Sequence, residues 1–173
     1  INYWNTSAAD AVAESVLSFL NNNPNLSSIG IGIEDNAKCP NENLPFDYEN
    51  GRSVTEESST VVYPDDPAYL STVFFTFLNH IADKVAEKYP KVMINTFAYF
   101  FAEVPPKCAI RGNIRVIFAP IGENVTESIP KNKEVYQNLE NWKKVTNNLV
   151  IYNYYGCFLA SSCYERPIAD RIQ

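Results

Sequence analysis

Residues 66–98, DPAYLSTVFFTFLNHIADKVAEKYPKVMINTFA, decide the fold class of this chain. Asp66 followed by Pro67 is typical of a helix start, because an aspartate caps free backbone N–H groups and proline fits the first helical position. Apolar side chains then recur with helical spacing. They are Leu70, Val73, Phe74, Phe77, Leu78, Ile81 and Val85. We therefore predict a helix over 67–88, ended by Tyr89-Pro90, and a strand over the β-branched run 92–98.

The alternation of helix and strand continues on both sides of this segment. Short runs rich in isoleucine, valine and leucine predict further strands at about 28–34, 114–119 and 149–154. Helical periodicity predicts further helices at about 8–21 and 132–146.

The first of these helices has its own start signal and apolar face. We expect Thr6 or Ser7 to cap it, with Asp10 near its positive end. The side chains expected on its apolar face are Val12, Val16, Phe19 and Leu20.

Strands that alternate with helices imply parallel βα units, and hence an α/β fold. The fifteen residues between the second and third strands are enough for a crossover without a full helix. Four such strands are about half of a (β/α)8 TIM-type barrel, which typically takes about 250 residues. We therefore expect residues 1–173 to form a single partial barrel domain, as a fragment of a longer protein.

Residues 36–66 form a long polar stretch without clear periodicity. Irregular stretches of this length are uncommon inside compact domains and often carry function.

Composition excludes several classes of protein. Hydrophobic residues make up 46% of the 173 residues and aromatic residues 13%, which is typical of a folded domain with a core. The net charge of −6 argues against a nucleic-acid partner, which favours a basic surface. Apolar runs stay far below the roughly 20 residues that span a bilayer. The first five residues lack the basic and apolar regions of a signal peptide, as expected of a mature chain or an excised segment.

The cysteines and the histidine do not form a recognisable metal or catalytic motif. Four cysteines lack zinc-like spacing, so we expect free, partly buried thiols, although Cys157 and Cys163 are close enough in sequence to pair. His80 is the one histidine and lies mid-helix, where a structural role is expected. A histidine-rich zinc site or a Ser-His-Asp triad is largely excluded, and we expect neither a metal nor a cofactor.

In parallel α/β folds, catalytic and ligand-binding residues lie at the carboxyl ends of the strands. The predicted strands offer four groups of residues there. They are Glu34, Asp35 and Asn36; Tyr99, Phe100 and Glu103; Pro120, Glu123 and Asn124; and Asn153, Tyr154 and Tyr155. Carboxylates, amides and aromatic rings together suit a carbohydrate, because rings stack on sugar C–H faces while amides and carboxylates bind hydroxyls.

The adjacent acids Glu34 and Asp35 are the most specific part of this pattern. Glycoside cleavage needs one carboxyl group that protonates the leaving oxygen and a second group that stabilises or attacks the anomeric carbon. Neighbouring strand residues point to opposite faces, so both acids reach one pocket only if the strand has ended at Glu34. The alternative is an ordinary solvated start of a loop.

From about Tyr89 to Phe158 the chain resembles a known bacterial family. The matching segments, in order, are Tyr89-Pro90, Thr96-Phe97-Ala98-Tyr99, Pro105-Pro106-Lys107, Gly112-Asn113-Ile114, Leu139-Glu140-Asn141-Trp142 and Asn147 to Tyr154. Upstream, Ile33-Glu34-Asp35-Asn36 followed by Cys39 resembles the family's acidic strand end. The family was first labelled domain of unknown function 4838 and largely became glycoside hydrolase family 163, endo-β-N-acetylglucosaminidases that act on complex N-glycans.

The resemblance implies substrate-assisted hydrolysis, in which the 2-acetamido oxygen of the sugar attacks the anomeric carbon. Asp35 would then steady the acetamido group and Glu34 would protonate the leaving oxygen, although these two roles could be reversed. From their places at the predicted strand ends, the residues expected to bind substrate are Asn36, Tyr99, Asn153, Tyr154 and Tyr155. A secreted or cell-surface location and a glycan partner follow from the same resemblance.

The chain also departs from the family pattern. It has Glu34 where the family often has an amide, and Tyr152-Asn153 where the family commonly has a tryptophan-aspartate pair. Three hypotheses therefore stay open: a glycoside hydrolase segment, a glycan-binding relative without catalysis, and a structural module of a larger surface protein. In each, exposed strand edges would favour association with the rest of the barrel or with a second copy.

Overall fold

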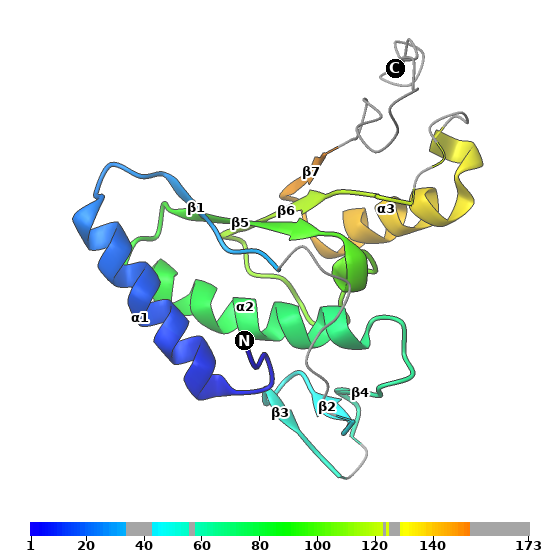
Figure 1. Cartoon of the computed structure of the whole chain (residues 1–173), viewed down its shortest axis with the longest axis horizontal. Helices are drawn as coiled ribbons and strands as arrows, with labels where there is room; N and C mark the ends of the chain where they lie inside the picture. The colour runs from blue at the N-terminus through cyan, green and yellow to red at the C-terminus, as the bar shows by residue number, and fades with distance from the viewer. Residues whose placement is uncertain (34–42, 56–57, 123, 125–128, 153–173) are drawn as a thin grey trace, which may run out of the picture.

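A computed structural model describes residues 1–33, 43–55, 58–122, 124 and 129–152 of the chain. Its main feature is a sheet of four parallel strands in the order β1-β5-β6-β7 (Figure 1). The strands are β1 (Ser28–Gly30), β5 (Met93–Ala98), β6 (Ile114–Phe118) and β7 (Leu149–Ile151). All three pairings are parallel, which confirms the arrangement expected from the sequence.

Strand β5 is the longest of the four and lies between two parallel neighbours. Ile94 is the register partner of Ile29 on one side and of Ile114 on the other. Along β5, Ile94, Thr96 and Ala98 are buried while Phe97 is exposed. The strand therefore has one face in the core and one face that the described part of the chain leaves partly open.

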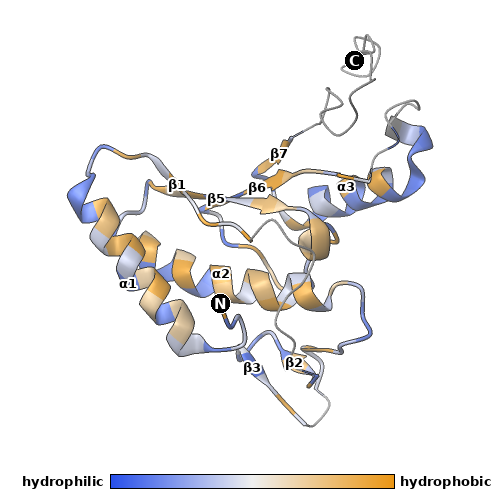
Figure 2. Ribbon diagram, in the orientation of Figure 1, coloured by the Kyte–Doolittle hydropathy of each residue, from blue (hydrophilic) through white to orange (hydrophobic). Residues whose placement is uncertain are grey.

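Three helices pack on the buried face of this sheet: α1 (Thr6–Asn22), α2 (Tyr69–Lys88) and α3 (Lys133–Val145). Figure 1 shows α1 and α2 together beneath the sheet. Helix α3 lies beside α2, because the rings of Trp142 and Phe75 are 5.4 Å apart. The main core combines apolar side chains from all three helices and all four strands. Figure 2 shows that α2 is largely hydrophobic and α3 largely hydrophilic, as their burial requires.

The helix starts differ by a residue or two from those predicted. Helix α1 is capped by Asn5, whose Oδ1 accepts from the Ser7 amide at 2.9 Å, rather than by Thr6 or Ser7. Helix α2 begins at Tyr69 rather than Pro67, because Asp66 first closes a turn. The Tyr69 amide donates to the Asp66 carbonyl at 2.9 Å, and the Ala68 amide donates to Asp66 Oδ1 at 2.8 Å.

The predicted apolar face of the first helix was wrong at one position. Phe19 is 49% exposed, whereas Ala9 and Ala13 are fully buried beside Val16 and Leu20. Small alanine side chains permit α1 to approach α2 closely, and this close contact rotates the buried face away from Phe19.

Part of the long polar stretch is a second, small sheet, which periodicity did not reveal. Its strands are β2 (Phe46–Asp47), β3 (Arg52–Ser53) and β4 (Val61–Val62), antiparallel in the order β3-β2-β4. The buried Asp47 carboxylate holds the turn after β2, since Oδ1 accepts from the amides of Glu49 and Asn50 at 3.0 and 3.1 Å. Burial alone would raise the pKa of Asp47, but hydrogen bonds from the Asn50 side chain, the Thr60 hydroxyl and these two amides outweigh it and keep the pKa below its ordinary value.

The remaining connections agree with the sequence interpretation. The crossover from β5 to β6 has a single short 3-10 helix, η1 (Phe100–Ala102), and η2 (Ile129–Lys131) precedes α3. Cys108 is a free, buried thiol, and burial raises its pKa to about 11. Cys39, Cys157 and Cys163 lie outside the described residues. Among the residues described, no helix has the length and apolar character needed to cross a bilayer.

Trp142 should be the most costly single truncation on α3. It is fully buried against Phe75 and donates from Nε1 to the Glu103 carbonyl at 2.8 Å. We expect Trp142→Ala to lower the free energy of unfolding by about 3–5 kcal/mol, because it leaves a large cavity and an unpaired carbonyl. Chemical denaturation measures this loss. Tyr136→Ala on the same helix is the control, and its 41% exposed ring should cost little. Equal losses in the two variants would contradict the packing described here.

Candidate functional site

The carboxyl ends of the four parallel strands meet at one edge of the sheet, called here the carboxyl edge. Backbone hydrogen bonding between neighbouring strands continues for one residue beyond the ends of β1, β6 and β7. The Ile31 amide donates to the Asn95 carbonyl at 2.9 Å, the Ala119 amide to Ala98 at 3.0 Å, and the Tyr152 amide to Phe118 at 2.8 Å. Residues that follow β1, β5, β6 and β7 therefore leave the sheet at a common edge, as the parallel connection predicts.

Most of the predicted site residues fall outside the part of the chain that the structure describes. These are Glu34, Asp35, Asn36, Glu123, Asn153, Tyr154 and Tyr155. Two described residues border them. Ile33, immediately before the acidic pair, is buried in the main core, and Tyr152, immediately before Asn153, is hydrogen-bonded to β6. Of the residues expected to bind substrate, Tyr99 is described.

Tyr99 belongs to a group of three aromatic rings at the carboxyl edge. The Phe97 ring lies 5.8 Å from the Tyr99 ring and 5.8 Å from the Tyr152 ring, in edge-to-face geometry. We call Phe97, Tyr99 and Tyr152 the aromatic platform. Phe97 is 37% exposed and Tyr152 is 49% exposed, so two of the three rings remain open to a partner.

Sequence reasoning selected Tyr99 but not the two rings beside it. The signal was present in the strand period, because residues 97 and 99 lie on the same face of an extended chain. The position of Tyr152 depends on the register of β6 with β7, in which Phe118 pairs with Ile151. That pairing is not encoded in any local pattern of the sequence.

The chain turns sharply just after Tyr99. Phe100 has φ of 49°, in the left-handed region that bulky side chains rarely adopt. The turn is held by hydrogen bonds from the Ala102 amide to Tyr99 and from the Glu103 amide to Phe100. The Tyr99 and Phe100 rings lie 4.6 Å apart, which adds a contact that favours this backbone shape. Such outliers cluster at functional sites.

Glu103 is the carboxyl group that the structure describes next to this turn. Its side chain is partly buried against α3, and burial raises its pKa above the ordinary value, opposed by a hydrogen bond with Asn138. The nearby Glu134 adds to the increase by charge repulsion. Glu103 therefore keeps its proton to higher pH than a solvated glutamate, which is a property of general acids.

His80 and Asp10 form part of an ionic contact between two helices. Asp10 Oδ1 lies 2.7 Å from His80 Nε2 and 2.6 Å from Lys84 Nζ, so α1 is tied to α2. Hydrogen bonds from Lys84 and His80 keep the pKa of Asp10 below its ordinary value. This contact gives His80 a structural partner. In the described ranges, histidine, cysteine and acidic side chains do not cluster into a group that could hold a metal ion.

The fold and the carboxyl edge together define the class of this chain. It is an α/β domain whose described helices cover one face of a parallel sheet, and a group of aromatic rings lies where the strands end. The chain belongs to the family described as domain of unknown function DUF4838, whose model matches residues 3–172. Comparisons with curated proteins and with solved structures gave no match.

The variant Glu103→Gln keeps the size of the side chain but removes its charge. It therefore measures how much free energy of unfolding is lost when the partly buried carboxyl group ionises. A pKa raised in the folded state means that stability is highest where Glu103 is protonated and falls as pH rises through the folded pKa. We expect the variant to be more stable than the parent chain near neutral pH, with the difference shrinking as pH falls below the ordinary glutamate pKa of about 4.3, where the carboxyl group becomes protonated in both states. Thermal unfolding across this pH range measures it.

The control for this measurement is Glu49→Gln, which changes an exposed carboxylate on the small sheet. A loss of stability in Glu103→Gln near neutral pH would mean that the ionised carboxylate is favourable where it lies, contrary to the burial described.

Proposed function

We propose that this chain is part of a glycoside hydrolase-like domain that binds N-acetylglucosamine-containing glycans at the carboxyl edge. The observation that carries the proposal is the aromatic platform at the carboxyl edge, together with the place of Glu34-Asp35 and Asn153 in the sequence, a few residues after β1 and β7 end. Exposed tyrosine and phenylalanine rings favour the C–H faces of a sugar, while the neighbouring acids and amides of the sequence would bind its hydroxyl and acetamido groups.

The finer architecture that we propose is a (β/α)8 barrel completed by further βα units. Two features support this. The strand order β1-β5-β6-β7 advances in one direction, with its helices on one face, as in a barrel wall. The other face is partly open, although parallel sheets are normally covered on both sides. On that face Phe97 and Val150 are exposed, and the buried Asn95 Oδ1 lacks a hydrogen-bond partner among the described residues.

The proposed chemistry is substrate-assisted hydrolysis. The acetamido oxygen of the bound sugar attacks its anomeric carbon, and the bond to the leaving oxygen breaks as that oxygen takes a proton from Glu34. Asp35 steadies the resulting oxazolinium ion, which water then opens as the Glu34 carboxylate takes a proton from that water and returns to its acid form. A proton donor needs a raised pKa, so Glu34 would be the drier member of the pair. A secreted or cell-surface location is part of this proposal, since complex glycans are found there.

A second candidate function is glycan binding without catalysis. It is favoured by Asn153, because an amide at this position cannot supply the negative charge of the aspartate that the family resemblance leads us to expect there. The aromatic platform would serve both functions equally well, so activity and binding have to be measured separately.

Tyr152→Ala tests the binding half of the proposal. The ring is half-exposed and packs edge-to-face on Phe97, so its removal should cost binding more than folding. We expect the affinity for a complex N-glycan, measured by calorimetry, to fall about fivefold or more, as loss of an aromatic contact implies. Tyr136→Ala, an exposed ring on α3, should leave affinity unchanged. Unchanged affinity in Tyr152→Ala would place the glycan elsewhere.

Turnover of the same glycan tests the catalytic half. We expect the 173-residue chain to release product slowly, because misplacement of positioning groups by about 1 Å costs on the order of a hundredfold. Whatever activity it has should be lost in Glu34→Gln and in Asp35→Asn. Activity that survives both substitutions would place the chemistry on other residues, and binding without any turnover would favour the non-catalytic alternative.

A further inference from the structure

A polar cleft of about 460 Å³ lies away from the strand ends, within the range of roughly 300–1000 Å³ that small-molecule sites occupy. Its lining comes from four parts of the chain: the start of α1, the turn after β2, one side of α2, and the loop before β6. None of the lining residues belongs to β1, β5, β6 or β7. The cleft is therefore distinct from the carboxyl edge.

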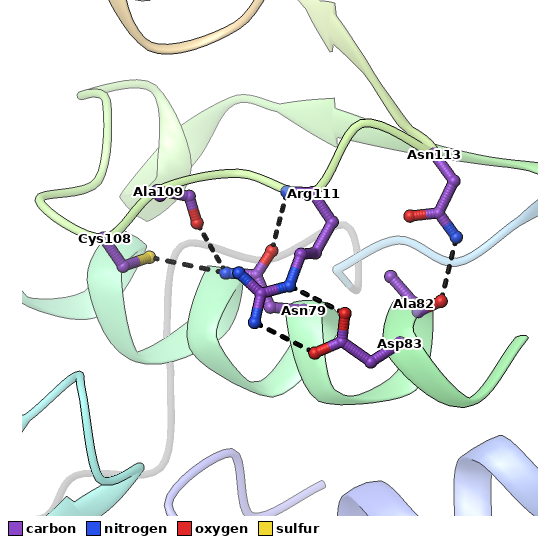
Figure 3. A network of polar contacts seen from close by, with 7 residues as sticks. All are labelled: Asn79, Ala82, Asp83, Cys108, Ala109, Arg111 and Asn113. Carbon is purple, nitrogen blue, oxygen red and sulfur yellow. Dashed lines mark hydrogen bonds and ion pairs between the residues drawn. The ribbon is translucent and has the colours of Figure 1, made fainter. Parts of the chain in front are cut away.

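One wall of the cleft is fixed by a network between α2 and the loop before β6 (Figure 3). The buried Asn79 uses both ends of its amide, since Nδ2 donates to the Ala109 carbonyl at 2.7 Å and Oδ1 accepts from the Arg111 amide at 3.1 Å. The Arg111 guanidinium then forms a bidentate pair with Asp83, with distances of 2.7 and 3.0 Å. The position of Arg111 is thus set before any ligand arrives.

A second wall is the turn after β2, which carries Tyr48 and Glu49. Asp47 fixes this turn through its amide contacts, and Gly51 completes it with φ of 63°, a conformation that favours glycine. An added Cβ at Gly51 would lie 3.8 Å from Thr76 Cγ2, so the turn packs directly against α2. Both walls are therefore held by contacts that do not involve a ligand.

Each wall keeps hydrogen-bonding capacity that the described residues do not use. The pair with Asp83 occupies Nε and Nη2 of Arg111, which leaves Nη1 as a donor without a partner in the described ranges. The exposed carboxylate of Glu49 likewise accepts no hydrogen bond from any described residue. A ligand in the cleft would find a donor in Arg111 and an acceptor in Glu49, both of which line it.

The charges of the cleft select a neutral ligand. Asp83 balances the charge of Arg111, so an anion gains little there, and Glu49 alone at an exposed position attracts a cation only weakly. Partly buried tyrosine rings, Tyr3 and Tyr48, add apolar surface to the lining. A neutral molecule with several hydroxyl groups would satisfy both walls at once.

We infer that this cleft is a second binding site for one neutral sugar unit, with Glu49 accepting from its hydroxyl groups and Arg111 donating to one of its oxygens. The inference rests on the proposed function only for the choice of N-acetylglucosamine as the probe. The cleft lies outside the carboxyl edge, where the reaction is proposed to take place. One sugar unit of a branched glycan could therefore bind in the cleft without being cleaved, while another unit occupies the carboxyl edge.

The test is a titration of the ¹⁵N-labelled chain with N-acetylglucosamine, followed by nuclear magnetic resonance. We expect saturable shifts of the backbone amides of Glu49, Asn50, His80 and Arg111. Glu49→Gln should weaken this binding about tenfold, as loss of a charge-assisted hydrogen bond implies. Glu14→Gln, an exposed acid on α1 outside the cleft, should leave it unchanged.

The positions of the shifts separate this inference from the proposed function. Shifts confined to Tyr99 and Tyr152 would overturn the second site and leave the carboxyl edge as the binding site. Saturable shifts in the cleft, weakened by Glu49→Gln, support the second site whether or not the carboxyl edge responds. If the cleft residues do not shift, or if Glu49→Gln binds as tightly as the parent chain, the inference is wrong.

Discussion

The parallel pairing of β5 with β1 and β6 is the constraint on which the rest of this structure depends. Both edges of β5 are hydrogen-bonded, and its buried face, formed by Ile94, Thr96 and Ala98, supports α2. A strand bonded on both sides must keep its register, because a slip by one residue would turn its apolar side chains outward. The same pairing makes the chain leave β1 and β5 at one edge, and this sets where chemistry can take place.

The core and the candidate site occupy different parts of the molecule. The core of helices and parallel strands is continuous, whereas the aromatic platform and Glu103 lie at or just beyond the strand ends, with Phe97 still within β5. Rings carried by a fixed sheet bind with little loss of side-chain freedom, which favours weak, extended ligands such as glycans. Membership in the DUF4838 family agrees with the sequence resemblance, and the activity proposed here goes beyond what that family description states.

Much of the architecture could be predicted from the sequence, because long amphipathic periods and β-branched runs are local signals. The seven apolar positions of α2 and the four strand segments were identified in this way. The small sheet was not, since strands of two residues have no period and depend on Asp47 to hold their turn. Phe19 was placed wrongly because helix rotation depends on close packing through Ala9 and Ala13.

The candidate site was predictable only in part for the same physical reason. Tyr99 could be identified from its place after a strand, but its grouping with Tyr152 through the Phe97 ring between them requires the register of three strands. The raised pKa of Glu103 comes mainly from burial, which depends on tertiary packing rather than on any local pattern of the sequence, and Asn138 and Glu134 of α3 modify it from about thirty residues further along the chain. The acidic pair Glu34-Asp35 remains a prediction, because it lies outside the described residues.

The direction of β1 beside β5 tests the account most directly, because it determines whether the segment that leads to Glu34 leaves the sheet at the same edge as the segment that carries Tyr99. Nuclear Overhauser contacts between the two backbones report it. The account predicts contacts that advance together, from Ser28 with Met93, through Ile29 with Ile94, to Gly30 with Asn95. Contacts of Ser28 with Asn95 and of Gly30 with Met93 would show antiparallel strands, and would place the acidic pair at the opposite edge from the aromatic platform.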